Sequence, residues 1–190
     1  YLVAGVVFRR YRSRAGLPNQ PLLISTSSIA LQGAIIHDYL PFLSKVMMAD
    51  GMLDSPLRAV LRKGKSHYVC DARLMKRLQT ANLDRKNPLA KAALLSMRDH
   101  LDLDMAPHLS GYDRERSCVP PTCDCGKTEC RYLCYLDVCA SERYAIQVCN
   151  HNLLLADAIH QGSGKRPILP DSCAIVMDEA HKLPETARQM

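Results

Sequence analysis

AIVMDEAH, residues 174–181, joins a run of four apolar residues to two adjacent acids, Asp178 and Glu179. The apolar run is typical of a buried strand, and the abrupt change to acids marks the end of that strand. Ligands of open α/β sheets bind at the carboxyl ends of the strands. In enzymes that transfer phosphoryl groups, such an Asp assists Mg²⁺ and a neighbouring acid can activate the attacking water. The alternative is an acidic pair that favours the dipole of a following helix.

Strands and helices alternate on the amino-terminal side of this stretch. PLLIS (21–25) predicts a short buried strand, and a helix follows from residue 28 to about 37, with Ser27 or Ser28 as its N-cap. YAIQVCN (144–150) predicts another strand, and HNLLLADAIH (151–160) a helix after it. This alternation is typical of an α/β fold with a parallel sheet.

The middle of the chain differs in character. Residues 71–101 have a helical pattern that is interrupted at Asn87-Pro88, and residues 109–130 look like a cysteine-rich loop. We therefore expect residues 1–61 and 144–190 to form the sheet domain. Residues 62–143 would form a mostly helical, cysteine-rich insertion.

Composition sets limits on the class of protein. The chain has 190 residues, no Trp and only two Phe, so its core must be aliphatic and rich in Met. No apolar run reaches the roughly 18–20 residues that span a bilayer, and no signal peptide opens the chain. We expect a cytoplasmic protein without a membrane partner. Because YLVAGVVFRRYRSR (1–14) reads as a helix already in progress, we expect a fragment of a larger protein.

Positive charge is concentrated rather than spread evenly. The formal net charge is +6, and the stretch 58–86 holds nine basic residues against two acids, Asp71 and Asp84. A concentrated field of this kind suits a phosphate backbone. The alternative is a basic helix face that only contacts solvent.

The nine cysteines are unevenly placed. Without a secretory signal, a disulfide framework is the weaker explanation. Cys149 and Cys173 lie in apolar runs and are expected to be small core residues. Six others form the pattern C-x4-C-x-C-x4-C-x3-C-x4-C from 118 to 139, and Cys70 lies far upstream. Of these six, Cys134 and Cys139 fall at helical spacing and suit helix packing.

Two metal centres compete for these thiols. Zinc fingers usually show paired C-x2-C motifs, which are missing here, whereas iron–sulfur clusters tolerate irregular spacing. One distant thiolate and three close together fit a cluster better. Zinc is the alternative metal. The preferred ligands are Cys70, Cys118 and Cys130, with either Cys123 or Cys125 as the fourth.

GSGK (162–165) looks superficially like a phosphate-binding loop. Arg166 stands where the loop needs Ser or Thr, and Ile159 stands where its first Gly belongs. The motif also follows a helix instead of a strand. We reject it, so these 190 residues contain no phosphate loop.

Several motifs together resemble one family. D-E-A-H (178–181) resembles motif II of superfamily 2 helicases. ISTSSIALQ (24–32) is similar to motif Ia of the DinG/XPD-type branch, which commonly reads I-S-T-x-x-x-x-L-Q. KGKSHYVC (63–70) resembles that branch's K-G-[KR]-x-x-Y-x-C, and QVCNHNLLLAD (147–157) its N-H-x-L-L segment. Because the matches follow the family's order, the chain resembles part of a bacterial DinG-like helicase.

The resemblance implies a partial RecA-like motor domain with an inserted [4Fe–4S] domain whose first ligand is Cys70. It implies ATP-driven movement on single-stranded DNA, unwinding of duplexes and junctions, and a role in DNA repair or replication stress. Asp178 would assist Mg²⁺, Glu179 would activate water, and His181 would link the nucleotide and DNA sites. The second motor domain would lie in the remainder of the protein. The residues implied to contact DNA phosphates are Ser25, Thr26, Arg62, Lys63 and Lys65.

Two other interpretations remain open. One is a zinc-stabilised module that binds nucleic acid or another protein and has no motor activity. The other is a degenerate helicase that is kept as a scaffold. Because the phosphate loop and the later helicase motifs are missing, we expect the chain by itself to be inactive toward ATP.

Overall fold

The structure, a computed structural model, describes residues 1–81, 88–123 and 130–190. The chain divides into two compact units. The first consists of residues 1–63 and 139–190, and the second of residues 64–138. The insertion expected at 62–143 overlaps the second unit.

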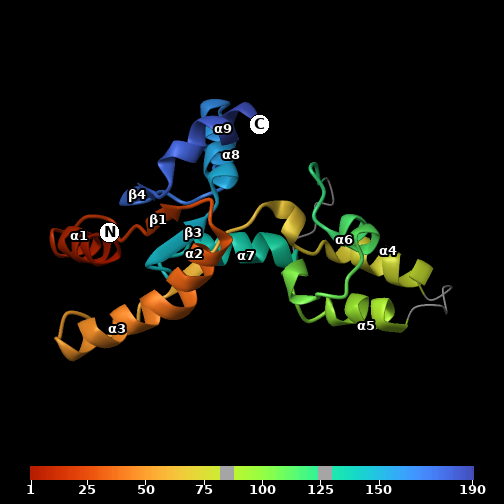
Figure 1. Cartoon of the computed structure of the whole chain (residues 1–190), viewed down its shortest axis with the longest axis horizontal. Coiled ribbons are helices and arrows are strands. Elements are labelled where there is room, and N and C mark those ends of the chain that lie inside the picture. Colours follow the sequence, from red (N-terminus) through yellow and green to blue (C-terminus); the bar gives the residue numbers. More distant parts are fainter. Residues whose placement is uncertain (82–87, 124–129) are drawn as a thin grey trace. The chain divides into compact units, whose positions relative to one another are not determined.

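The first unit contains a four-stranded parallel sheet (Figure 1). Its strands lie in the order β2 (Ala59–Leu61), β3 (Ile146–Cys149), β1 (Leu22–Ser25) and β4 (Ala174–Met177). All three pairings are parallel. The predicted α/β class with a parallel sheet is therefore confirmed, and the arrangement is RecA-like in kind.

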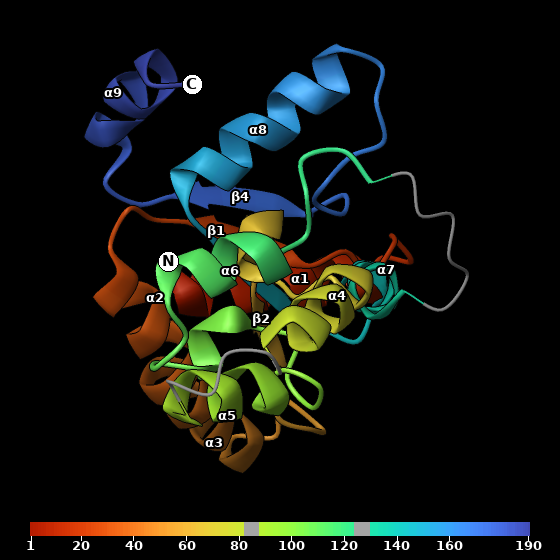
Figure 2. The ribbon, with the colours of Figure 1, turned by 90° about the vertical axis from the view of Figure 1, so that its right-hand side faces the viewer.

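Helices cover both faces of this sheet (Figure 2). On one face lie α1 (Leu2–Arg14), α2 (Ile29–Ala34) and α3 (Leu40–Ala49), and on the other lies α8 (His151–Gly162), with α9 (Leu183–Arg188) beside it. Successive side chains of β1 lie on opposite faces of the sheet. Leu22 and Ile24 pack with the first group of helices, and Leu23 packs with α8. In α1, Gly5 allows close approach to the sheet, because a Cβ there would lie 2.4 Å from a methyl carbon of Leu22.

Three local features differ from the sequence expectation. The helix expected to end near 37 continues through a π-helical segment, Ile35–Tyr39, directly into α3. Strand β2 was not expected, since three apolar residues carry too little pattern to predict a strand. The strand β4, expected to be buried, lies at the edge of the sheet, and Ile175 and Met177 are each 50% exposed.

The second unit is helical. It contains α4 (Asp71–Ala81), α5 (Pro88–Ser96), α6 (Gly111–Ser117) and most of α7 (Arg131–Ala140). The predicted helices around Pro88 are confirmed, but the loop expected over 109–130 is wrong for residues 111–117. There Ser110 caps α6 by accepting a hydrogen bond from the backbone of Asp113. The polar sequence of α6 has no apolar periodicity, so only its cap could have revealed the helix.

A separate core holds this unit together. It is built from apolar side chains of α4, α5 and the segments around them: Val69, Leu74, Leu78, Leu94, Met97, Leu103, Ala106 and Leu109. Two isolated antiparallel bridges, Tyr68 with Asp102 and Val69 with Cys118, join the start of the unit to its later segments. Among the helices in the described ranges, none is long and apolar enough to cross a membrane.

Candidate functional site

The carboxyl ends of β1 and β4 form the centre of the candidate site. These strands are neighbours, with Ser25 in register with Met177. The backbone N–H of Asp178 continues the pairing by donating to the carbonyl oxygen of Ser25 at 2.9 Å. The loop after β1 and the D-E-A-H segment therefore leave the sheet side by side, although they are far apart in the sequence.

The four consecutive hydroxyls at 25–28 each have a different partner. Ser25 Oγ lies 2.7 Å from Nδ1 of His151, the first residue of α8. Thr26 Oγ1 accepts from the backbone N–H of Ser28 at 3.2 Å, and Ser28 Oγ accepts from that of Leu31 at 3.2 Å. Ser28 is thus the N-cap of α2. The hydroxyl of Ser27 donates to the carboxylate of Glu179.

Glu179 has an unusual backbone and a well-defined carboxylate. Its φ of 53° is the one positive value of a non-glycine residue among the described residues, and it turns the chain from β4 into the next helical turn. Oε2 accepts from Ser27, and Oε1 accepts from Lys182 Nζ at 3.1 Å. These hydrogen bonds, that of Ser27 first, lower the pKa of Glu179. The carboxylate is therefore ionised at neutral pH, as an acceptor of a proton must be.

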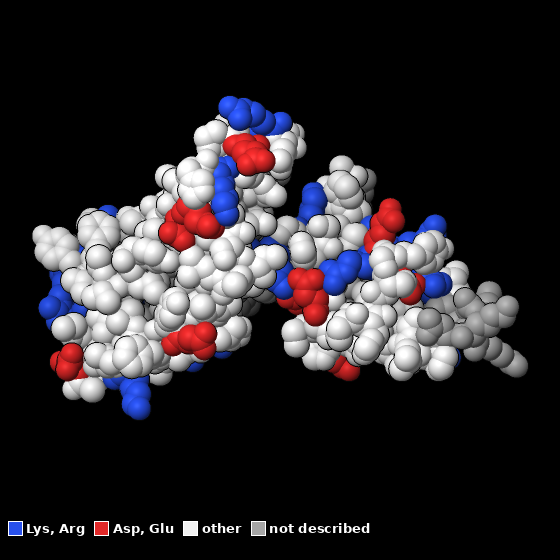
Figure 3. All heavy atoms as spheres, in the orientation of Figure 1, with Lys and Arg blue, Asp and Glu red and all other residues white. Residues whose placement is uncertain are grey.

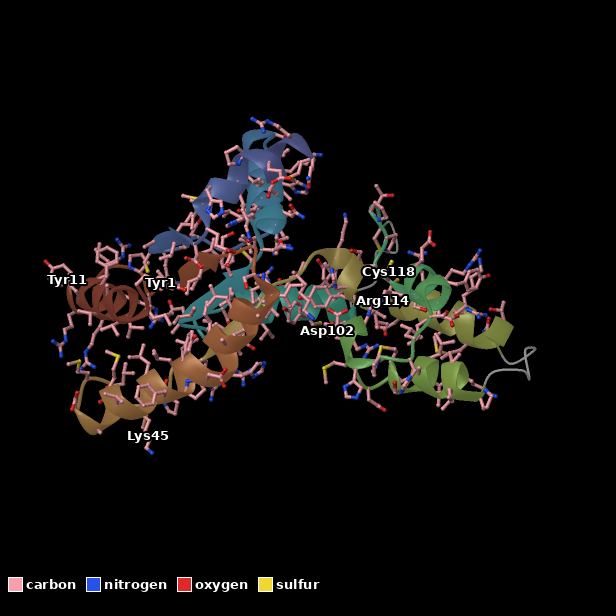
Figure 4. The ribbon with its side chains drawn as sticks, viewed as in Figure 1. Tyr1, Tyr11, Lys45, Asp102, Arg114 and Cys118 are labelled. Carbon is pink, nitrogen blue, oxygen red and sulfur yellow. The ribbon has the colours of Figure 1, made fainter. Side chains whose placement is uncertain are left out.

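The other two residues of the predicted catalytic set flank Glu179. Asp178 is half-buried directly after β4, whereas His181 is exposed in the 3-10 turn Ala180–Lys182. Burial, and then the negative charge of Asp178, raise the pKa of the Tyr1 phenol, which is labelled in Figure 4.

The residues predicted to contact DNA occupy different environments. Ser25 and Thr26 are fully buried. Arg62 is also buried, and its guanidinium donates to Gln147 Oε1 at 2.8 Å and to the carbonyl oxygen of Ile168 at 2.9 Å. Lys63 is half-buried and Lys65 is exposed, with its ammonium donating to the carbonyl oxygen of Pro121.

Three of the predicted cluster ligands lie on neighbouring segments of the second unit. The N–H of Cys70 donates to the carbonyl oxygen of Ser117 at 2.8 Å, which brings the backbone of Cys70 close to Cys118. Cys118, labelled in Figure 4, directly follows α6. Cys130 adjoins Arg131, whose Nε donates to Asp71 Oδ1 at 2.8 Å, so its segment also lies against that of Cys70. The Cys118 thiol is 3.8 Å from a guanidinium nitrogen of Arg73.

The thiols that the structure describes are nevertheless not gathered into a metal site. Within the described ranges, no three Cys, His, Asp or Glu side chains are grouped so that they could hold a metal ion. Cys123 is exposed, and Cys125 lies outside the described residues. Cys70, Cys118 and Cys130 match an iron–sulfur cluster in chemical type, and their segments are neighbours. These three described thiols are not assembled round a common centre.

Charge on the second unit is more mixed than the sequence suggests. Arg77, one of the basic residues of the 58–86 stretch, forms an ion pair with Asp113, and Arg114 pairs with Asp104. On the face of this unit seen in Figure 3, basic and acidic side chains are interspersed. Part of the excess charge therefore serves the packing of the unit.

Sequence reasoning missed three contributors to this site. His151 and Lys182 hold Ser25 and Glu179 respectively, and Ser27 was considered only as a helix cap. No signal in a single sequence links Ser27 to Glu179, because the contact depends on which strands are neighbours. The N-H dipeptide at the start of α8 was the available pointer to His151.

Comparisons with known proteins agree with the resemblance. Over 94% of its length the chain is 28% identical to the ATP-dependent DNA helicase YoaA of Escherichia coli, and covers 29% of that protein. It is 26% identical over 99% of its length to the ATP-dependent DNA helicase DinG of Photobacterium profundum, and 26% over 88% to YoaA of Haemophilus influenzae. It covers 28% and 27% of these two proteins.

The chain thus spans less than a third of the curated relatives that it matches. No protein-family model matches it. Similarity over nearly the whole chain to one part of DinG- and YoaA-type helicases confirms the predicted resemblance to a DinG-like fragment.

Proposed function

We propose that the chain is part of the first motor domain of a DinG-type ATP-dependent DNA helicase. In the full-length protein this domain would use ATP hydrolysis to move along single-stranded DNA and separate duplexes and junctions, in repair or under replication stress in the bacterial cytoplasm. One observation carries the proposal. The segment similar to motif Ia and the D-E-A-H segment lie at one edge of a parallel sheet, joined by the Asp178–Ser25 and Ser27–Glu179 hydrogen bonds.

The chemistry follows from the positions of the acids. Asp178, half-buried at the strand end, would bind the water shell of the Mg²⁺ that accompanies ATP. Glu179, ionised at neutral pH, would orient the attacking water and accept its proton. His181, exposed one turn later, would couple this site to the DNA site. The phosphate loop and the second motor domain would come from the remainder of the protein.

Single-stranded DNA is the proposed partner of the loop after β1. Ser27 and Ser28 are half-exposed and can present hydroxyls to a phosphate. Ser25 and Thr26 would support this loop from within, and Arg62 would similarly brace the start of the insertion. Lys65, and Lys63 beside it, would add positive charge for the phosphate backbone.

The cysteine-rich unit is proposed to hold a [4Fe–4S] cluster. Its ligands would be Cys70, Cys118 and Cys130, with Cys123 or Cys125 as the fourth. When bound, the cluster would supply covalent cross-links between these segments and a redox-sensitive structural centre. The chain's own contribution is to bring the segments of Cys70, Cys118 and Cys130 together through the backbone bond to Ser117 and the Asp71–Arg131 pair.

The motor proposal is tested by ATP hydrolysis of the full-length protein with and without single-stranded DNA. We expect Glu179→Gln to lower kcat by about 10²–10⁴-fold, the contribution typical of a positioned general base. Glu185→Gln, in the exposed first turn of α9, is the matched control and should leave kcat unchanged. Wild-type kcat in Glu179→Gln would show that the D-E-A-H segment is not catalytic.

The cluster proposal is tested on protein purified without oxygen. We expect a brown protein that contains iron and acid-labile sulfide, and loss of both in Cys118→Ser. Cys134→Ser, which replaces an exposed thiol on α7, should retain the iron and the sulfide. A colourless protein with stoichiometric zinc after the same purification would contradict the cluster.

A further inference from the structure

We propose that Ser27 is a positioning residue that restrains the Glu179 carboxylate in the absence of DNA and releases it when a DNA phosphate takes over the Ser27 hydroxyl. This inference rests on the proposed motor function, which it deepens by identifying how DNA binding is sensed at the hydrolytic site.

Among the four hydroxyls at the end of β1, that of Ser27 has a distinct partner. The hydroxyls of Thr26 and Ser28 bond within their own segment, and that of Ser25 bonds to His151 inside the fold. Ser27 reaches across to the loop after β4, a separation of 152 residues. It therefore joins the proposed DNA loop directly to the proposed catalytic acid.

The restraint acts on both oxygens of Glu179. Oε2 is held by the hydroxyl of Ser27 and Oε1 by the ammonium of Lys182. Two donors fix the orientation of the carboxylate and weaken it as a base, because hydrogen bonds to the ionised form favour that form. Both effects oppose the turn toward an attacking water that general-base catalysis requires.

Release follows from the chemistry of a hydroxyl, which has only one proton to donate. Ser27 is half-exposed, so a phosphate oxygen can approach its Oγ from solvent. If Ser27 donates to that phosphate, it cannot at the same time donate to Glu179. DNA contact and restraint of Glu179 are therefore alternatives.

The backbone on both sides of Ser27 is fixed by hydrogen bonds, so the exchange of hydrogen-bond partners can be confined to the Ser27 side chain. On the amino side the backbone of Thr26 is anchored at both polar groups. Its N–H donates to the carbonyl oxygen of Cys149, and its own carbonyl oxygen accepts from Gln32 Nε2 at 3.0 Å. On the carboxyl side Ser28 begins α2 as its N-cap. Between these fixed points, a rotation of the Ser27 side chain is enough to exchange one acceptor for the other.

The test compares kcat of the full-length protein, with and without single-stranded DNA, in Ser27→Ala, Ser27→Val and Ser27→Thr. Val and Thr have the same shape and differ in the hydroxyl. We expect Ala and Val to raise the DNA-free kcat by about two- to ten-fold, as expected for loss of one hydrogen bond, and to reduce the stimulation by DNA correspondingly. Thr should behave as wild type, and so should Ser163→Ala, in the turn after α8.

Rescue by Thr gives a readout that a merely structural role would not change. Thr keeps a hydroxyl that can donate to Glu179, so the stimulation by DNA should be reduced in Val and retained in Thr, although the two side chains have the same shape. Unchanged DNA-free kcat in Ala and Val, in a protein whose activity still requires Glu179, would overturn the role of Ser27 alone. If the wild-type protein has no Glu179-dependent hydrolysis, the motor proposal fails together with this one.

Discussion

Burial distinguishes the described cysteines of this chain chemically. Cys149 and Cys139 are fully buried, and burial raises the pKa of Cys149 to about 12, an effect that the nearby Ser25 hydroxyl only partly opposes. The predicted core role of Cys149 and the packing role of Cys139 are therefore confirmed. Cys123 and Cys134 are exposed. The exposed thiols of Cys123 and Cys134 are open to reagents from solvent, whereas those of Cys139 and Cys149 are not.

Alkylation with iodoacetamide should show this division. In the native chain at pH 8 we expect Cys134 to be modified and Cys149 to be protected, because its thiol remains protonated until the pH approaches its raised pKa. Peptide mass spectrometry measures the modified fraction of each. Unfolding in urea provides the control, since both should then react. Equal modification of Cys134 and Cys149 in the folded chain would contradict the burial.

At the scale of elements, one ion pair links two helices of the second unit. Arg77 Nε on α4 lies 2.6 Å from Asp113 Oδ1 on α6, and the hydroxyl of Ser110 donates to the other oxygen of Asp113 at 2.7 Å. Asp113 is buried and Arg77 nearly so. By contrast, the side chains of Arg114 and Asp104 are 34% and 38% exposed. Loss of the buried Arg77–Asp113 pair should therefore lower the free energy of unfolding much more than loss of the exposed Arg114–Asp104 pair.

Replacement of the acid in each pair by Ala measures this difference in the free energy of unfolding. Asp113→Ala leaves Arg77 without its carboxylate in a buried setting, and we expect it to lower the free energy of unfolding by about 3 kcal/mol. Asp104→Ala, the exposed counterpart, should lower it by less than about 1 kcal/mol. Urea denaturation followed by circular dichroism measures both values. Equal losses in the two variants would show that the α4–α6 contact does not depend on the buried pair.

At the scale of the whole molecule, the chain would supply only part of the proposed hydrolytic site. It carries the acids at the end of β4, but no phosphate loop occurs in its 190 residues. GSGK (162–165) does not replace it, since Gly162 is the last residue of α8 and Gly164 lies in the turn after it with φ of 68°. Binding and orientation of a triphosphate need backbone amides that these residues do not supply.

We therefore expect the 190-residue chain to hydrolyse ATP no faster than its own Glu179→Gln variant, in the presence or absence of single-stranded DNA. Phosphate release measured at saturating ATP and Mg²⁺ tests this. The full-length protein serves as the positive control. Robust activity of the short chain that disappears in Glu179→Gln would refute the expectation.

Local sequence determined most of the elements and the acids of the site. Apolar runs and turn residues placed β1, β3, β4 and the helices after them, because such patterns depend on neighbours within a few residues. Tertiary structure alone decided that β1 lies between β3 and β4, that Ser27 meets Glu179, and that Arg62 is buried against Gln147. These contacts join residues 85 to 152 positions apart. They arise from the order of the strands in the sheet, which cannot be predicted from patterns of neighbouring residues in the sequence.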